Sequence, residues 1–129
     1  MNTPANLKYA KTDEWVKADG NIATVGISDF AQDQLSDIVF IEFNCEPDDA
    51  VNKGDALATI ESVKAAADVN CPISGKVLEV NEGLADIPET LNGDPYEKGW
   101  LYKIEMSSPA ELNDLMDAAA YTAFCEGRH

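Results

Sequence analysis

The chain has 129 residues, a length that suits one hydrophobic core and leaves no room for a second full domain. Hydrophobic residues make up 45% and charged residues 26% of the chain, proportions that are near globular averages and exclude intrinsic disorder. With 24 acidic against 9 basic residues, the formal net charge is -15. This excess of acid disfavours nucleic acid and anionic membranes as partners, because both require clustered Lys and Arg.

A β-hairpin and a short helix are predicted near the start of the chain. Residues 14–18 and 22–27 are β-prone runs around an Asp-Gly pair, and Gly20 accepts the positive φ that a tight hairpin turn requires. Ser28 follows at an N-cap position, with Asp29 in the first turn of a helix of about two turns.

Four further strands are predicted from the apolar runs that follow. Residues 37–43 are almost continuously apolar, which indicates a strand buried on both faces. Turn residues separate the other runs, at 56–60, 76–80 and 100–106, and a short helix is expected near residues 88–91. Several short strands with frequent turns favour an all-β sandwich or flattened barrel with a few helices.

The clearest helix signal lies near the end of the sequence. Ser108 at the N-cap, Pro109 at the first helical position and Glu111 three residues after the cap match a capping box. Apolar residues then recur at helical spacing, and Gly127 suits a C-terminal cap. We therefore expect one helix over residues 108–126 that packs against the core.

Conventional catalytic and metal chemistry is hard to build from these residues. The only histidine is His129, at the end of the sequence, where chains commonly fray, so it is a poor general base or metal ligand. No Cys-x-x-Cys pair occurs, so a reducing compartment is expected for the three cysteines, Cys45, Cys71 and Cys125. The absence of a long apolar run and of a signal peptide predicts a soluble, intracellular protein.

The segment around Lys64 is compatible with two local structures. Residues 62–67 could form one helical turn with Ser62 as its cap, because alanine and lysine favour helices. In the other structure, the strand through Ile60 leads to a hairpin turn and residues 68–70 return. The hairpin would place the Lys64 amine at an exposed tip.

Short motifs along nearly the whole chain match the sequence pattern of one protein family. The lysine stands in Glu61-Ser62-Val63-Lys64-Ala65, and the other matching segments are Lys8-Tyr9, Glu14-Trp15-Val16, residues 26–33, residues 37–40, Pro72-Ile73-Ser74-Gly75, Asp94-Pro95-Tyr96 and Gly99-Trp100-Leu101. The sequence thereby resembles the H protein of the glycine cleavage system, within the lipoyl and biotinyl carrier superfamily. Biotinyl carriers typically flank the lysine with methionines, and lipoyl domains of 2-oxo acid dehydrogenases typically place Asp before it.

This resemblance implies a mainly β fold, a flattened barrel-sandwich hybrid of two small sheets with a lipoyl hairpin, short helices and a C-terminal helix. It implies one lipoyl-carrier domain over residues 1–129, with a core at about 7–106 and the C-terminal helix at about 108–126. Lipoate would be bound covalently to Lys64 and would reach roughly 14 Å from the lysine Cα. Its strained cyclic disulfide would open readily by exchange. No metal is implied.

The resemblance also implies a carrier and not an enzyme. The lipoyl-lysine arm would take the aminomethyl group of glycine from glycine decarboxylase (P protein) to the aminomethyltransferase (T protein). Dihydrolipoyl dehydrogenase (L protein) would then reoxidise the arm, which a lipoate ligase or lipoyl transferase attaches in the first place. The expected location is the bacterial cytoplasm, or the mitochondrial matrix for a mature eukaryotic chain.

The loaded arm carries a cationic amine that would hydrolyse in water, so H proteins are expected to fold it into a surface cleft. Glu14, Thr12 and Asp68 match family positions near that cleft. We expect Glu14 to accept the ammonium group, because charge-assisted hydrogen bonds are strong. The alternative is that Glu14 is a surface carboxylate that caps a strand end.

Two residues depart from the H-protein pattern. Asp13 stands where the family usually has a histidine, which leaves the role of that position open. Cys71 replaces the usual serine before Pro72, a change that a small residue in a turn should tolerate.

Three other functions stay open from the sequence. An H-like protein could relay lipoyl groups to other complexes instead of cycling aminomethyl groups. A biotin carrier domain would use the same lysine for carboxyl transfer, although Val63 and Ala65 disfavour it. An acidic binding module would leave Lys64 as an ordinary surface residue.

Overall fold

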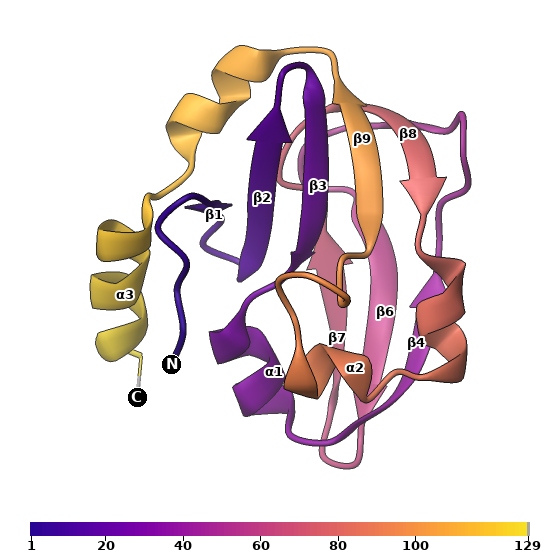
Figure 1. Cartoon of the computed structure of the whole chain (residues 1–129), viewed down its shortest axis with the longest axis vertical. Coiled ribbons are helices and arrows are strands. Elements are labelled where there is room, and N and C mark those ends of the chain that lie inside the picture. The colour runs from indigo at the N-terminus through magenta and orange to yellow at the C-terminus, as the bar shows by residue number, and fades with distance from the viewer. Residues whose placement is uncertain (129) are drawn as a thin grey trace.

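A computed structural model describes residues 1–128 and shows two antiparallel β-sheets with short helices around them (Figure 1). The larger sheet has six strands in the order β1-β2-β3-β9-β8-β5, and the smaller has three in the order β4-β6-β7. The predicted mainly β fold of two sheets is confirmed, but the sheets are unequal in size and do not close into a barrel within the described residues. His129 lies outside them.

The strands and helices follow one another in this chain order. The strands are β1 Lys8–Tyr9, β2 Glu14–Asp19, β3 Ile22–Ile27, β4 Ile38–Phe43, β5 Ala50–Val51, β6 Ala56–Ser62, β7 Ala66–Asn70, β8 Gly75–Val80 and β9 Tyr102–Met106. The α-helices are α1 Asp29–Leu35, α2 Thr90–Gly93 and α3 Ala118–Glu126, and two 3₁₀ helices are η1 Glu82–Asp86 and η2 Pro109–Asp114.

The predicted N-terminal hairpin and the helix after it are both confirmed. Strands β2 and β3 pair along their whole length around Gly20, which has a φ of +61°. Ser28 caps α1, because its Oγ accepts a hydrogen bond from the Ala31 N–H at 3.1 Å. This pairing fixes the start of β2 beside the start of α1, where the functional site is built.

Trp15 explains two of the segments that the sequence shares with H proteins. Its indole Nε1 donates a hydrogen bond of 2.9 Å to the Pro95 carbonyl, so β2 holds the loop before β9. The ring lies across Gly26 of β3, where an added Cβ would come within 2.7 Å of it. Glycine is therefore required at this position by the close approach of the tryptophan.

Strand β4 is not buried on both faces, and that prediction is wrong. Only Ile38 and Ile41 have buried side chains in it, whereas Val39 is 54% and Phe40 46% exposed. Two features explain the difference. β4 is an edge strand of the smaller sheet, and an irregularity in its pairing between Ile38 and Phe40 exposes two consecutive apolar side chains.

The predicted C-terminal helix is confirmed as α3, but the prediction that one continuous helix spans residues 108–126 is wrong. The segment begins as η2, is extended at Leu115, where ψ is 158°, and continues as α3. The N-cap of α3 is Asp117, which accepts from the Ala120 N–H at 2.8 Å, while Ser108 makes no side-chain cap.

Tertiary contacts account for the interruption of this helix. The Glu111 carboxylate does not complete a capping box but accepts from the Ser74 N–H at 2.8 Å and from its hydroxyl at 3.1 Å. The backbone of Met116 pairs with Tyr9 through two hydrogen bonds of 2.8 Å, which forces an extended conformation before α3. α3 then packs beside β1, and its Tyr121 ring stacks on Tyr9 at 4.6 Å.

Candidate functional site

Lys64 lies at the tip of a hairpin and not in a helical turn. Strands β6 and β7 pair antiparallel up to Glu61 and Ala66, which leaves residues 62–65 as the turn. In Figure 1 this turn projects at the lower end of the molecule, at the opposite end from the β2–β3 turn. Lys64 is exposed, as the hairpin alternative predicted.

Ser62 organises this turn from inside it. Its Oγ accepts hydrogen bonds from the backbone N–H groups of Lys64 at 3.2 Å and Ala65 at 3.0 Å. The Ser62 N–H donates in turn to the Ala65 carbonyl at 2.8 Å. A serine hydroxyl that bonds its own following backbone is typical of a defined turn, so the lysine is presented on an ordered backbone.

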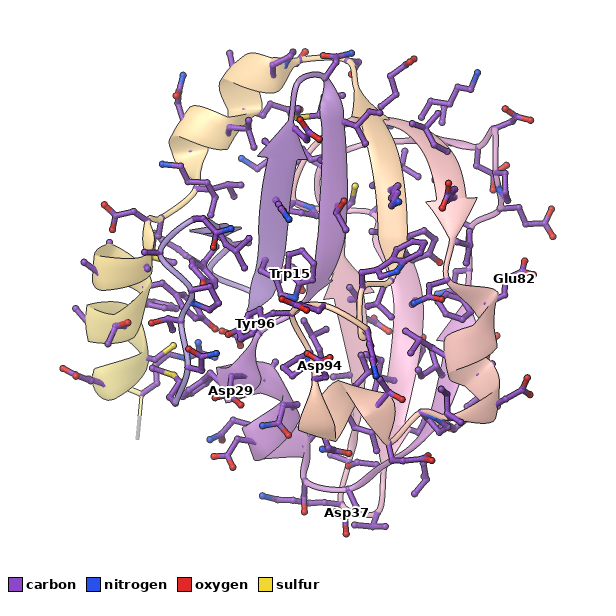
Figure 2. All side chains as sticks on the ribbon, in the orientation of Figure 1. Trp15, Asp29, Asp37, Glu82, Asp94 and Tyr96 are labelled. Atoms are coloured by element: carbon purple, nitrogen blue, oxygen red, sulfur yellow. The ribbon has the colours of Figure 1, made fainter. Side chains whose placement is uncertain are left out.

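The turn is also tied to the neighbouring edge strand. The Val63 N–H donates to the carbonyl of Asp37, just before β4, at 3.0 Å. Figure 2 shows Asp37 at the same lower end of the molecule as the turn. The Lys64 side chain itself makes no hydrogen bond or ion pair with any residue of 1–128. Its amine is therefore available to react and is attached to an ordered support.

A cavity of about 280 Å³ lies beside this hairpin, between the start of β2, α1 and β7. It brings together Thr12, Glu14 and Asp68, the three residues predicted for arm docking. Asp68 is four residues from Lys64, at most roughly 14 Å along an extended chain. The rest of the lining is largely apolar and consists of Ile27, Phe30, Ala31, Leu35, Ile60, Ala67 and Val69, with Asp13, Gln34 and Arg128 as further polar members.

Glu14 is the buried charge of this cavity, with only 1% of its surface exposed. One carboxylate oxygen accepts from the Thr12 hydroxyl, and the other accepts from the Asn70 N–H at 3.2 Å. Burial raises the pKa of Glu14 from 4.5 to about 7, although these two hydrogen bonds act in the opposite direction. The interpretation of Glu14 as a surface carboxylate is thus wrong.

Asp68 differs from Glu14 in being exposed to solvent. It accepts a hydrogen bond of 3.2 Å from the Thr59 hydroxyl on β6, which orients it on the smaller sheet. Besides Asp13, the cavity therefore has one buried carboxylate, Glu14, and one exposed carboxylate, Asp68. A cationic group at the end of an apolar chain suits this lining.

Asp13 forms an ion pair that the sequence analysis did not predict. Its carboxylate accepts two hydrogen bonds from the Arg128 guanidinium, at 2.5 and 2.8 Å. The two residues are 115 positions apart, so no local pattern connects them. The only available signal was that Arg128 is the one arginine of the chain.

Cys71, the other departure from the family pattern, is buried in the core. Its thiol donates to the Ile73 carbonyl at 2.7 Å, the kind of contact that a serine hydroxyl would make. Burial raises the pKa of this thiol to about 12. Cys71 is therefore a structural residue that stays protonated, and not a reactive thiolate.

Residues 1–128 contain neither a cluster of metal ligands nor a membrane-spanning helix. No group of three or more His, Cys, Asp and Glu side chains in this part of the chain is arranged to hold a metal ion. None of its helices is long and apolar enough to span a membrane.

A two-sheet β domain that presents an exposed lysine on a hairpin tip, beside an acidic and apolar cavity, has the architecture of a carrier domain. Comparison with known proteins gives the particular family. The family model described as glycine cleavage H-protein matches residues 7–128. The chain belongs to this family.

Individual relatives agree with this assignment. The glycine cleavage system H protein of Symbiobacterium thermophilum is 52% identical over 123 residues, which cover 95% of both chains. The mitochondrial H protein of Pisum sativum is 52% identical over 125 residues, which cover 97% of this chain and 75% of that protein. A crystal structure of the H protein from Mycobacterium marinum superimposes with a TM-score of 0.84 at 32% identity, covering 93% of this chain and 96% of that one.

Proposed function

We propose that this protein is the lipoyl carrier of the glycine cleavage system and that Lys64 bears the lipoyl group in amide linkage. The observation that carries the proposal is the free, exposed Lys64 amine on an ordered hairpin tip in a chain that matches the H-protein family over residues 7–128. Val63 and Ala65 beside the lysine support a lipoyl group over biotin.

The residues around Lys64 fit such a group. The apolar chain of a lipoyl group suits the hydrophobic lining of the cavity, and the carboxylates of Glu14 and Asp68 suit a cationic amine at the end of the loaded group. When bound, lipoate supplies a strained cyclic disulfide that opens by thiol–disulfide exchange. The chain itself supplies the support: Ser62 orders the turn, the apolar lining of the cavity would shelter the arm from water, and Glu14 would bind the cationic end.

The partners that we propose are those of a glycine cleavage carrier. Glycine decarboxylase would load the arm, the aminomethyltransferase would unload it, and dihydrolipoyl dehydrogenase would reoxidise it, after a lipoate ligase or lipoyl transferase has attached it. In this cycle the chain acts as a substrate of each enzyme and not as a catalyst. We propose the bacterial cytoplasm as its setting, or the mitochondrial matrix, because similar H proteins come from bacteria and from pea mitochondria.

Mass analysis followed by reconstitution tests this proposal. The apo protein is incubated with lipoate, ATP and a lipoate ligase, and peptide mapping then locates the modification. We expect one lipoyl addition per chain, on Lys64, and exchange of labelled bicarbonate into glycine when glycine decarboxylase is added. A biotin-sized addition, or lipoylation at another lysine, would refute the assignment. Lipoylation at Lys64 without bicarbonate exchange would favour the lipoyl relay.

Replacing Glu14 with glutamine is expected to expose the aminomethyl-loaded arm to hydrolysis. A hydrogen bond to a charged group contributes about 1.5–3 kcal/mol, so losing the carboxylate should shorten the lifetime of the loaded form by about 10- to 100-fold. Release of ammonia from the isolated, loaded protein measures this lifetime. Glu105→Gln, which removes an exposed carboxylate from β9, is the matched control. Equal lifetimes in the two variants would remove the docking role of Glu14.

A further inference from the structure

The Asp13–Arg128 pair is built into the wall of the arm cavity. Both residues line the cavity, together with Glu14. The Asp13 side chain is 15% and the Arg128 side chain 33% exposed, so the carboxylate is largely shielded from water while the guanidinium still reaches solvent. The guanidinium also lies over the rings of Phe30 at 4.4 Å and Phe124 at 4.9 Å. Arg128 is therefore fixed in position by a two-point hydrogen bond and by stacking.

Asp13 occupies a backbone conformation that needs such support. Its φ is +77°, in the left-handed region that residues other than glycine rarely adopt. This residue stands directly between Thr12 and Glu14, so its conformation sets the direction of both side chains. The Asp13 carbonyl accepts from the Ser28 N–H at 2.9 Å, and its carboxylate accepts from the Tyr121 hydroxyl at 2.8 Å and from Arg128.

A chain of hydrogen bonds extends this support to α1. The Tyr121 hydroxyl lies 2.6 Å from the Ser28 hydroxyl and 2.8 Å from the Asp13 carboxylate. Because Tyr121 donates its only hydroxyl proton to Asp13, Ser28 is the donor in the contact between Ser28 and Tyr121. The Ser28 oxygen is at the same time the N-cap acceptor of α1. The turn at residues 11–13, directly before Glu14 and β2, is thus joined to α1 through Ser28 and to α3 through Tyr121.

The charges of Asp13 and Arg128 also affect Glu14 and a cationic cargo. The Asp13 carboxylate is adjacent to Glu14 and disfavours its ionised form, and an unpaired Arg128 in the same wall would repel a cationic cargo. The other polar groups in contact with Glu14 are the Thr12 hydroxyl and the Asn70 N–H, and Asp68 and Gln34 line the same cavity. In the ion pair the guanidinium opposes the charge of Asp13, so that Glu14 and Asp68 are the carboxylates of the cavity without a cationic partner.

We propose that Arg128 is a positioning residue of the arm cavity. Its two hydrogen bonds to Asp13 fix the turn at residues 11–13 and so orient Thr12 and Glu14, and its positive charge offsets that of Asp13 beside Glu14. This inference deepens the proposed function and rests on it for the identity of the cargo. It assigns a role to the position where the family usually has histidine. Asp13 performs this role together with Arg128, which follows α3.

Titration of Glu14 by NMR in the full-length apo protein tests the electrostatic half of the proposal without the lipoyl group. Arg128→Gln leaves Asp13 uncompensated, so the pKa of Glu14 should rise by about 0.5–1 pH unit. Asp13→Asn leaves Arg128 uncompensated, so the pKa should fall by about the same amount. The double variant should return it to within about 0.3 unit of the wild type, as should the control Lys103→Gln, whose partner is Glu79.

Shifts of opposite sign separate this role from a purely structural one, because loosened packing would change the pKa in the same direction in both single variants. Shifts of the same sign, or none, would overturn the electrostatic role. The positioning role is tested on the loaded arm with Arg128→Lys, which keeps the charge but loses the planar fork. We expect the pKa of Glu14 to stay within about 0.3 unit and the loaded lifetime to fall about 3- to 10-fold.

An unchanged lifetime in Arg128→Lys would overturn the positioning role. If the lifetime is also unchanged in Glu14→Gln, it is the proposed docking of the arm that fails. The titration shifts do not depend on the arm, so they decide the electrostatic coupling in either case.

Discussion

Replacing Lys64 with arginine is expected to abolish lipoylation and to leave the fold intact. Guanidinium stays protonated in proteins and is not acylated by a ligase that activates lipoate for an amine. The Lys64 side chain is exposed and has no partner among residues 1–128, so the free energy of unfolding should change by no more than about 0.5 kcal/mol. Intact mass after incubation with lipoate and ligase, together with urea denaturation, measures both quantities.

Net charge offers a second readout of the same experiment. Acylation of one lysine removes one positive charge, so the wild type should change from a formal net charge of -15 to about -16. A native gel should therefore show a faster band for the modified wild type and no shift for Lys64→Arg. Lys17→Arg is the matched control, since Lys17 is an exposed lysine of β2 in the other sheet. A lipoyl addition to Lys64→Arg would show that another lysine is the acceptor.

Local signals explain why the hairpins and the lysine tip were predictable from sequence. Gly20 sets the β2–β3 turn through its positive φ, and Ser28 caps α1 through a hydrogen bond within its own segment. The tip at Lys64 was one of two alternatives on local grounds, because residues 62–67 have favourable helix propensity. What decides against a helix is the pairing of β7 with β6, in which five residue pairs are aligned.

The wrong predictions fail where a distant segment overrides a local pattern. Residues 37–43 have the composition of a buried strand, but Val39 and Phe40 are exposed because β4 lies at the edge of its sheet. The capping-box pattern at Ser108 fails because Glu111 bonds to Ser74, 37 residues earlier. Sequence periodicity reports neither the position of a strand in its sheet nor a contact with a distant residue.

The cavity shows the same division between local and distant information. The family pattern indicated Thr12, Glu14 and Asp68, and the structure brings all three to one cavity. The pattern carried no information about Arg128, whose partner is at the other end of the chain. Nor did it indicate that Glu14 is buried, which depends on how α1 and β7 cover the start of β2.

Burial of Glu14 leads to the last prediction, that Glu14→Gln stabilises the apo protein at pH 8 and not at pH 4. The folded protein holds a proton on Glu14 up to about pH 7, whereas the unfolded chain releases it near its ordinary value of 4.5. Between these values the folded state binds more protons than the unfolded state, so the free energy of unfolding falls as the pH rises. The difference of about 2.5 units corresponds to a loss of about 3 kcal/mol above pH 7.

Glutamine avoids this loss because its amide is neutral at every pH, and it retains an acceptor for the Asn70 N–H and a donor for the Thr12 oxygen. Urea denaturation at pH 4, 6 and 8 should show a stability gain over the wild type that grows from near zero to about 3 kcal/mol. Glu105→Gln should give no such trend, because its carboxylate is exposed. Parallel curves for the wild type and Glu14→Gln would contradict the raised pKa.

The same denaturation experiment on the aminomethyl-loaded protein connects the stability of the fold with docking of the arm. A buried, ionised carboxylate destabilises the empty protein near neutral pH, and a cationic amine docked beside it would remove that penalty. The loaded wild type should therefore regain stability at pH 8, whereas loading should not stabilise Glu14→Gln. A carboxylate that is unfavourable when alone thus becomes the group that favours the docked arm over the free one.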